Sequence, residues 1–229
     1  MREQKDQISA LISDISHQTK TPIANLLLYA QLLEEQDLPP ESREYASALE
    51  HQAEKLRFLI DALVKTSRLE SGVLAMTPKR HGIQQLLDAA SAQAAPGAEA
   101  KAITLTVEPT DLTARFDPKW TAEALYNLVD NAVKYTPAGG AVTLRAVGYE
   151  LFCRVDVTDT GPGIPESEQA RIFQRFYRSP SASEAEGVGS GLYLARQIAA
   201  GQGGYLKVSS RPGEGSTFSL FLPRAEERT

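Results

Sequence analysis

This sequence has only one cysteine, no long hydrophobic run and no excess of positive charge. Cys153 is the only cysteine in 229 residues, so an internal disulfide and a thiolate metal site are both excluded. We interpret it as a small buried hydrophobic residue in a protein from a reducing compartment. No apolar stretch approaches the length of a membrane span, and the polar residues 1–6 do not form a signal peptide.

The formal net charge is −5, and Lys and Arg are scattered along the chain. A nucleic-acid-binding protein usually gathers such residues into a basic stripe. We therefore expect a cytoplasmic segment that contacts neither nucleic acid nor a membrane.

The first part of the chain has the periodicity of helices. Apolar residues recur at intervals of three and four up to about Gln36, which predicts a helix with one buried face. Residues 37–40 predict a turn, and a heptad rhythm then runs from Tyr45 to Thr66. Two helices bury too little surface to be stable alone. We expect residues 1–72 to form an all-α helical hairpin that pairs with a second copy into a dimeric four-helix bundle.

From residue 73 the pattern changes to short alternating runs between helical segments, which predicts a second domain of α+β class over residues 73–229. The expected elements are helices around 84–93, 119–135 and 191–202, a short helix after Pro165, and antiparallel hairpin strands near 142–159 and 204–222. The small, acidic segment 179–186 has the composition of a mobile lid, which Phe173, Phe176 and Tyr177 would anchor.

His17 opens the run His-Gln-Thr-Lys-Thr-Pro on the first helix, where Asp14, His17 and Thr21 share one face. Pro22 cannot donate a backbone hydrogen bond, so we expect the helix to bend just past His17 and expose the imidazole. A neutral imidazole nitrogen is a good nucleophile near neutral pH. This suits His17 to accept a phosphoryl group, although a lone histidine on a helix is more often a solvated surface residue.

A polar side of the helix around 119–135 predicts a nucleotide pocket. Asn127, Asn131, Lys134 and Tyr135 fall on this side, whereas apolar residues form the other. Amide oxygens suit Mg²⁺ alongside waters and phosphate oxygens, and Lys134 adds a positive charge for the phosphates.

Two glycine-rich segments complete the pocket. Asp159 precedes Gly161 and Gly163, which let the backbone turn tightly against a flat ligand while the carboxylate accepts hydrogen bonds from an exocyclic amine. Further along, a helix N-terminus suited to phosphates is preceded by Gly187, Gly189 and Gly191. No Gly-Lys-Ser/Thr follows, so this second segment is not a P-loop.

In this order the motifs resemble the catalytic core of a two-component sensor histidine kinase, over nearly the whole chain. The resemblance implies that residues 1–72 are the dimerisation and histidine phosphotransfer domain. Residues 73–229 would be the catalytic ATP-binding domain, a two-layer α+β sandwich with a mixed, mainly antiparallel sheet of the GHKL type found in gyrase and MutL ATPases. A sensor or membrane anchor in a longer parent protein follows from the family alone.

The resemblance also implies ATP-dependent autophosphorylation of His17 and transfer to an aspartate on the receiver domain of a response regulator, with a homodimer as the working state. ATP and Mg²⁺ are the implied cofactors. Asn131 and Asn127 would hold the metal, Lys134 and Tyr135 would approach the phosphates, Asp159 would read the adenine amine, and Thr217 would lie near the base. Thr21 resembles the residue that positions water for dephosphorylating the regulator, so a phosphatase activity is expected as well.

Gln18 departs from the family's pattern, which usually has Glu or Asp directly after the histidine. An amide cannot act as a carboxylate base, so either autophosphorylation is slower or Asp14, one turn earlier, substitutes. Two other readings stay open: an ATPase of the same nucleotide fold that transfers phosphate to water, and a non-enzymatic dimeric scaffold that binds nucleotide and a regulator. The flanks of His17 argue against the first, and the intact pocket argues against the second.

Overall fold

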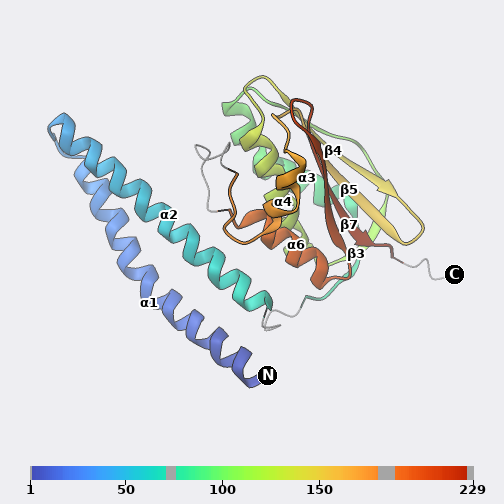
Figure 1. Cartoon of the computed structure of the whole chain (residues 1–229), viewed down its shortest axis with the longest axis horizontal. Coiled ribbons are helices and arrows are strands. Elements are labelled where there is room, and N and C mark those ends of the chain that lie inside the picture. Colours follow the sequence, from blue (N-terminus) through green and yellow to red (C-terminus); the bar gives the residue numbers. More distant parts are fainter. Residues whose placement is uncertain (1, 71–75, 180–188, 226–229) are drawn as a thin grey trace. The chain divides into compact units, whose positions relative to one another are not determined.

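The computed structural model describes residues 2–70, 76–179 and 189–225 (Figure 1). Its contacts divide the chain into two compact units, Met1–Ala75 and Met76–Thr229. No helix among the described residues is long and apolar enough to cross a membrane.

The first unit is a helical hairpin made of α1 (Arg2–Glu34) and α2 (Pro40–Glu70). Pro40 stands at the first position of α2, where its missing N–H costs nothing, and Glu41 places a negative charge near the positive end of the helix dipole. Helix α1 continues through Pro22 to Glu34, so the proline does not end it. The expected hairpin is confirmed.

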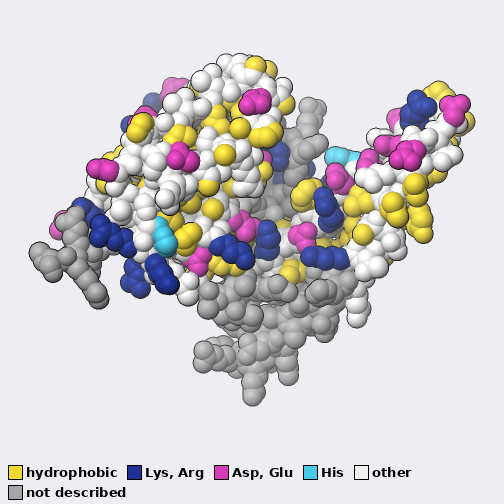
Figure 2. Space-filling view, turned by 180° about the vertical axis from the view of Figure 1, so that it is seen from behind, with side chains coloured by type: hydrophobic (Ala, Val, Ile, Leu, Met, Phe, Trp, Pro, Cys, Tyr) yellow, Lys and Arg dark blue, Asp and Glu magenta, His cyan; other side chains and the backbone are white. Residues whose placement is uncertain are grey.

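Most of the buried side chains among the described residues of the hairpin are small. The buried apolar side chains of the hairpin are Ile23, Ala30, Ala46, Ala53 and Val64. Several larger apolar side chains stay in contact with water instead (Figure 2). Helix periodicity places Leu26, Tyr29 and Leu33 on one side of α1 and Tyr45, Leu49 and Leu56 on one side of α2, each 42–62% exposed, and we call these six residues the apolar seam. Leu28, Leu32 and Phe58 are exposed on other sides of the two helices.

The second unit contains a five-stranded sheet in the order β2-β4-β5-β7-β6 and a two-stranded sheet of β1 and β3. Its elements are β1 (Lys79–Gly82), α3 (Ile83–Ala100), β2 (Thr104–Val107), β3 (Thr113–Phe116), α4 (Pro118–Tyr135), β4 (Ala141–Gly148), β5 (Phe152–Asp159), α5 (Glu166–Gln169), a 3-10 turn (Arg171–Phe173), α6 (Gly191–Gly201), β6 (Tyr205–Arg211) and β7 (Gly215–Pro223). All neighbouring strands of the large sheet are antiparallel except β2 and β4. The sheet is therefore mixed and mainly antiparallel, as expected.

Two details differ from the sequence-based expectation, and a third explains why the sheet is mixed. Helix α3 runs to Ala100 instead of ending near residue 93, because buried Ala94 and Ala98 continue its apolar side past Pro96. Strands β1 and β3 were not anticipated. Strand β2 pairs in parallel with β4, because β3 and α4 lie between them in sequence and carry the chain back to the same end of the sheet.

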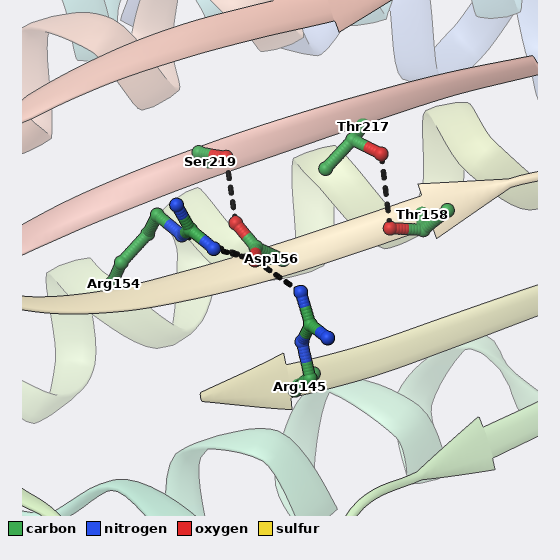
Figure 3. A network of polar contacts seen from close by, with 6 residues as sticks. All are labelled: Arg145, Arg154, Asp156, Thr158, Thr217 and Ser219. Carbon is green, nitrogen blue, oxygen red and sulfur yellow. Dashed lines mark hydrogen bonds and ion pairs between the residues drawn. The ribbon is translucent and has the colours of Figure 1, made fainter. Parts of the chain in front are cut away.

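Helices α3, α4 and α6 cover one side of the large sheet (Figure 1). Side chains alternate along the strands, so Val155, Val157, Phe218 and Leu220 point into this core. The other side of the sheet, which we call the open face, carries polar residues (Figure 3). There the buried Asp156 carboxylate pairs with Arg154 at 2.9 Å and Arg145 at 3.3 Å and accepts a hydrogen bond from Ser219 Oγ at 2.6 Å.

Candidate functional site

Helix α4 supplies the first part of the site. Asp117 caps its N-terminus by accepting from the backbone N–H groups of Lys119 and Trp120, and Pro118 follows the cap. The expected apolar side is buried, and its members in this stretch are Leu125, Leu128, Val129, Ala132 and Val133. Asn127, Asn131 and Lys134 are only half-buried, so the polar side of the helix remains accessible to a ligand.

The N-terminus of α6 comes against this polar side. Asn127 Nδ2 donates to the Glu123 carbonyl at 2.8 Å, which fixes the amide and leaves Oδ1 turned toward Gly191. A Cβ atom at Gly191 would stand 2.7 Å from Asn127 Oδ1, closer than real Cβ atoms come. Glycine is therefore needed where α6 begins, and the amide of Asn127 and the start of α6 belong to one site.

Asp159 ends β5 on the same side of the sheet as the helices and is only 6% exposed. Its Oδ1 accepts a hydrogen bond from the Gly161 N–H at 2.8 Å. A Cβ at Gly161 would lie 2.7 Å from that oxygen and 3.2 Å from the Tyr135 carbonyl. The absence of a side chain at Gly161 thus lets the loop after β5 lie against the end of α4.

Two effects act in opposite directions on the pKa of the Asp159 carboxyl group. Burial raises the pKa of its carboxyl group above the ordinary value of 3.8, and hydrogen bonds from the backbone N–H groups of Gly161 and Ser216 partly lower it again. A buried carboxylate with few protein partners is costly unless a ligand donates to it. The group is suited to receive a hydrogen bond from a flat, amine-bearing ligand.

Thr217 does not join this cluster. The Cα partners across β5 and β7 are Asp159 with Ser216 and Thr158 with Thr217, so side-chain alternation places Thr217 on the open face. There its hydroxyl lies 3.0 Å from that of Thr158 (Figure 3). The buried Ser216 is the residue of β7 that lies opposite Asp159. The strand register, which sequence alone does not give, decides between the two.

Left-handed backbone is required at two of the expected glycines. Gly163 has φ +73°, and a Cβ there would collide with the Arg211 carbonyl. Gly189 has φ +71°, and a Cβ there would lie 2.5 Å from the carbonyl oxygen of Tyr177. Gly187 and most of the expected lid lie outside the described residues.

The expected anchors of that lid divide into two kinds. Phe173 is buried and packs edge-on against Phe218, with ring centroids 6.5 Å apart. Phe176 is 43% exposed, whereas Tyr177 stacks with the Arg171 guanidinium. Because Gly189 rests against the backbone of Tyr177, this segment does contact the residues that lead into α6.

Lys134 and Tyr135 stand at the C-terminal end of α4. Lys134 Nζ lies 3.8 Å from Asp130 Oδ2, a loose pair that leaves the ammonium available to phosphates. Burial raises the pKa of the Tyr135 phenol, against the lowering effect of Arg178, so its hydroxyl stays a hydrogen-bond donor at neutral pH. The Asn131 side chain makes no hydrogen bond within the part of the chain that the structure describes.

The first unit holds the remaining expected residues. Asp14, His17, Gln18 and Thr21 all lie on α1, and Gln18 and Thr21 are exposed. Pro22 provides no N–H for the Gln18 carbonyl, so the helix loses one internal hydrogen bond next to His17. On α2, Asp61 Oδ1 pairs with Lys20 Nζ at 2.9 Å and ties the two helices together one turn beyond His17.

Known proteins with the same arrangement were found for both units. Residues 7–72 match the His Kinase A (phospho-acceptor) domain, and residues 116–226 match the Histidine kinase-, DNA gyrase B-, and HSP90-like ATPase family. Sensor protein DivL of Caulobacter vibrioides is 33% identical over 94% of this chain and 28% of its own length. The sensor-like histidine kinase SenX3 of Mycobacterium tuberculosis is 32% identical over 93% of this chain and 53% of its own length.

The solved structures agree. Full-length ShkA in complex with AMPPNP superimposes with a TM-score of 0.77 and 29% identity, covering 96% of this chain and 47% of that one. The mycobacterial sensor histidine kinase MprB gives a TM-score of 0.57 at 26% identity over 66% of this chain.

A helical hairpin with a phosphoacceptor motif, followed by a GHKL-type sandwich, defines a class of ATP-binding signalling proteins. The chain belongs to the sensor histidine kinases and corresponds to their catalytic core. It spans between about a quarter and about half the length of the curated relatives it matches.

Proposed function

We propose that this protein phosphorylates His17 with ATP and passes the phosphoryl group to an aspartate on the receiver domain of a response regulator. The supporting observation is that three motifs far apart in the sequence come together around α4. Gly191, at the start of α6, approaches Asn127, and Gly161, after β5, approaches the end of α4. We also propose that residues 1–72 serve dimerisation and phosphotransfer and that residues 73–229 bind the nucleotide.

The residues of the second unit fit ATP and Mg²⁺. Buried Asp159 is an acceptor for the exocyclic amine of adenine, and the accessible amide oxygens of Asn127 and Asn131 are ligands of the kind Mg²⁺ takes. When bound, the metal neutralises charge on the phosphates. Lys134 and the N-terminus of α6 add positive potential for the same groups.

The transfer itself needs little beyond position and charge. An imidazole nitrogen of His17 attacks the γ-phosphorus, and a nitrogen–phosphorus bond forms as the bond to the bridging oxygen breaks and ADP leaves. A base takes up the imidazole proton. Gln18 cannot serve in this way, so we propose Asp14, one turn earlier on α1, for that role.

We propose a homodimer as the working state, because the apolar seam of the hairpin needs a partner of matching chemistry. A groove of about 410 Å³ on the hairpin, lined by Lys20, Ala24, Leu27, Leu28, Gln31, Arg57 and Asp61, offers the regulator an apolar floor with a charged rim. The exposed Thr21 lies within one turn of that groove, which supports a second, phosphatase activity toward the regulator. We place these reactions in the cytoplasm, in a protein longer than this chain.

The deciding experiment is incubation with Mg²⁺ and γ-labelled ATP, followed by acid and alkali treatment. The parent should acquire label that acid releases and alkali does not, which is the behaviour of phosphohistidine. His17→Ala should remain unlabelled, whereas His51→Ala, which removes an exposed histidine from α2, should label like the parent.

Two results would contradict the proposal. Release of inorganic phosphate with no labelled protein would indicate an ATPase of the same fold. Nucleotide binding without label or hydrolysis would indicate a scaffold, and Gln18 would then be the residue to restore to Glu.

A further inference from the structure

A buried polar cluster joins α4 to α6 far from the nucleotide site. It consists of Asp117 at the N-terminal cap of α4, Thr121 in its first turn and Gln202 at the C-terminal cap of α6, and we call it the α4–α6 junction. Their exposed fractions are 9%, 0% and 7%. Buried polar side chains of this kind cost free energy unless they are fully paired.

Gln202 is the residue that joins the two helices. Its Oε1 accepts the Asp117 backbone N–H at 2.5 Å, and its Nε2 donates to Thr121 Oγ1 at 3.0 Å. A second bond from Nε2 to the Ile198 carbonyl, 3.2 Å away, holds the side chain against its own helix. The amide therefore spans the gap between α4 and α6 with both of its polar atoms used.

The segment that enters the second unit is attached at the same place. Thr77 donates its backbone N–H to Asp117 Oδ2 at 3.0 Å, and a Cβ at Gly201 would stand 3.1 Å from Met76 Cε. Met76 thus lies against the end of α6 while Thr77 binds the cap of α4. The hydrogen bonds from Thr77, Trp120 and Lys119 outweigh burial and lower the pKa of Asp117, so this carboxylate stays charged at neutral pH.

The two helices have little freedom at their other point of contact. At the start of α6, Gly191 approaches Asn127 so closely that even a methyl group would not fit. Helix α6 is 11 residues long, so Gln202 acts from about 16 Å away. A helix keeps its internal hydrogen bonds when it is displaced, so its two ends move together. A change in the distance between α6 and α4 at Gln202 therefore changes the position of Gly191 beside Asn127, whose amide we propose binds the metal.

We propose that Gln202 is a positioning residue for the nucleotide site, setting the spacing of α4 and α6 through Asp117 and Thr121. The proposal rests on the nucleotide-binding role given above. Gln202 stands at the opposite end of α6 from Gly191 and is not one of the residues that we propose contact the nucleotide. Replacing Gln202 should therefore weaken nucleotide binding and raise the KM for ATP, while the turnover rate of bound ATP changes little.

The test compares Gln202→Met with Gln84→Met in the full chain. Gln84 is a matched control, because its Oε1 also accepts a backbone N–H, that of Thr110 at 2.8 Å, but on α3. Calorimetry with Mg²⁺ and a non-hydrolysable ATP analogue should show the Kd raised about tenfold by Gln202→Met, the loss expected for one buried polar contact. The autophosphorylation KM for ATP should rise by a similar factor, whereas Gln84→Met should leave both values near those of the parent.

A merely structural role would give a different result. Both variants would then melt at lower temperature, and the Kd of Gln202→Met, measured well below its melting point, would equal that of the parent. That outcome overturns the inference while leaving the proposed function intact. A parent protein that binds no nucleotide analogue would overturn both.

Hydrogen exchange on the parent tests the inference even if Gln202→Met fails to fold. Binding of the analogue should slow exchange at the Asp117 amide, which donates to Gln202, because a ligand that fixes one contact between α4 and α6 stabilises the other. The Thr110 amide, which donates to Gln84, serves as the internal reference. Equal protection of the two amides, or none at Asp117, would count against a link between the junction and the site.

Discussion

The carboxylate of Asp159 serves two opposed requirements. Folding favours its neutral form, because burial raises the pKa of the group, with backbone hydrogen bonds from Gly161 and Ser216 acting against the shift. The proposed contact with an amine needs the charged acceptor instead. Such a residue lowers the stability of the free protein in order to serve the ligand.

Replacing Asp159 by Asn should separate these two effects. The folded parent binds a proton at Asp159 more strongly than the unfolded chain does, so its stability falls as pH rises from the ordinary pKa of 3.8 to the raised value. Asn does not titrate. Urea unfolding across pH 3–7 should therefore show that the free energy of unfolding of Asp159→Asn, relative to that of the parent, rises with pH and then reaches a plateau. The variant should also bind the nucleotide analogue more weakly than the parent does. A difference that stays flat with pH would contradict the assigned burial effect.

Cys153 should report on unfolding of the second unit. The thiol is 1% exposed, and burial, only partly offset by Arg224, raises its pKa to about 11. Alkylation needs both access and the thiolate, so iodoacetamide at pH 8 should label the native protein only when the sheet opens. Labelling followed by mass spectrometry should track the unfolding transition in urea. Rapid labelling of the native protein would show that β5 is accessible without unfolding.

Residue types and spacing were sufficient to predict the polar side of α4 and its buried apolar side. Asn127, Asn131 and Asp159 stand where the expectation put them, because helix periodicity and the end of a strand are both readable from sequence. Sequence does not show which residue of β7 lies opposite Asp159, because a shift of one residue in strand register moves a side chain to the other face. Gln202 gave no signal, since its role depends on an approach of α4 and α6 that no local pattern records.

At the scale of elements, the pocket depends on how closely the start of α6 approaches α4. Ala at Gly191 would place its Cβ 2.7 Å from Asn127 Oδ1 and force the amide out of position. We expect Gly191→Ala to weaken binding of the nucleotide analogue about tenfold or more.

A matched substitution controls for helix propensity. Gly97→Ala lies inside α3, where the new Cβ would make ordinary contact with Val133 at 3.6 Å. This change should raise stability by about 0.5–1 kcal/mol and leave binding unchanged. Calorimetry and thermal melts on both proteins check the pair, and equal affinities for the nucleotide analogue would show that Asn127 tolerates a methyl group at the start of α6.

Elements of regular period were predicted better than irregular ones. Helices α1, α2 and α4 and the β4–β5 and β6–β7 hairpins follow their hydrophobic patterns. Strand β1, Lys79–Gly82, has three basic or imidazole side chains and a glycine, so nothing in its composition indicates a strand. Strand β1 pairs with β3 only because the fold brings the two segments together. The end of α3 was predicted too early because Pro96, which usually ends a helix, lies inside it.

At the scale of the whole molecule, the hairpin buries small side chains and leaves large apolar ones exposed. A self-sufficient hairpin would bury its leucines between the helices, yet the buried side chains among the described residues of α1 and α2 are mostly small ones, three of them alanines. The leucines and aromatic residues of the apolar seam remain exposed instead. Burying one such side chain contributes about 1.5–3 kcal/mol, so a second hairpin placed on the seam supplies stability that the single chain cannot.

This arrangement predicts a dimer that charges in the seam will dissociate. Sedimentation equilibrium of the parent should give twice the chain mass of 24.9 kDa. Leu49→Glu combined with Leu56→Glu removes two apolar contacts per protomer, or about 6 kcal/mol over a symmetric interface, which raises the dimer Kd by about four powers of ten. The double variant should sediment as a monomer at micromolar concentration, whereas Lys55→Gln, an exposed change on the same helix, should not alter the mass. A monomeric parent, or a double variant that stays dimeric, would mean that the seam is covered in some other way. Because the second unit has its own core, the monomeric variant should still bind the nucleotide analogue, so loss of the dimer can be told apart from loss of the fold.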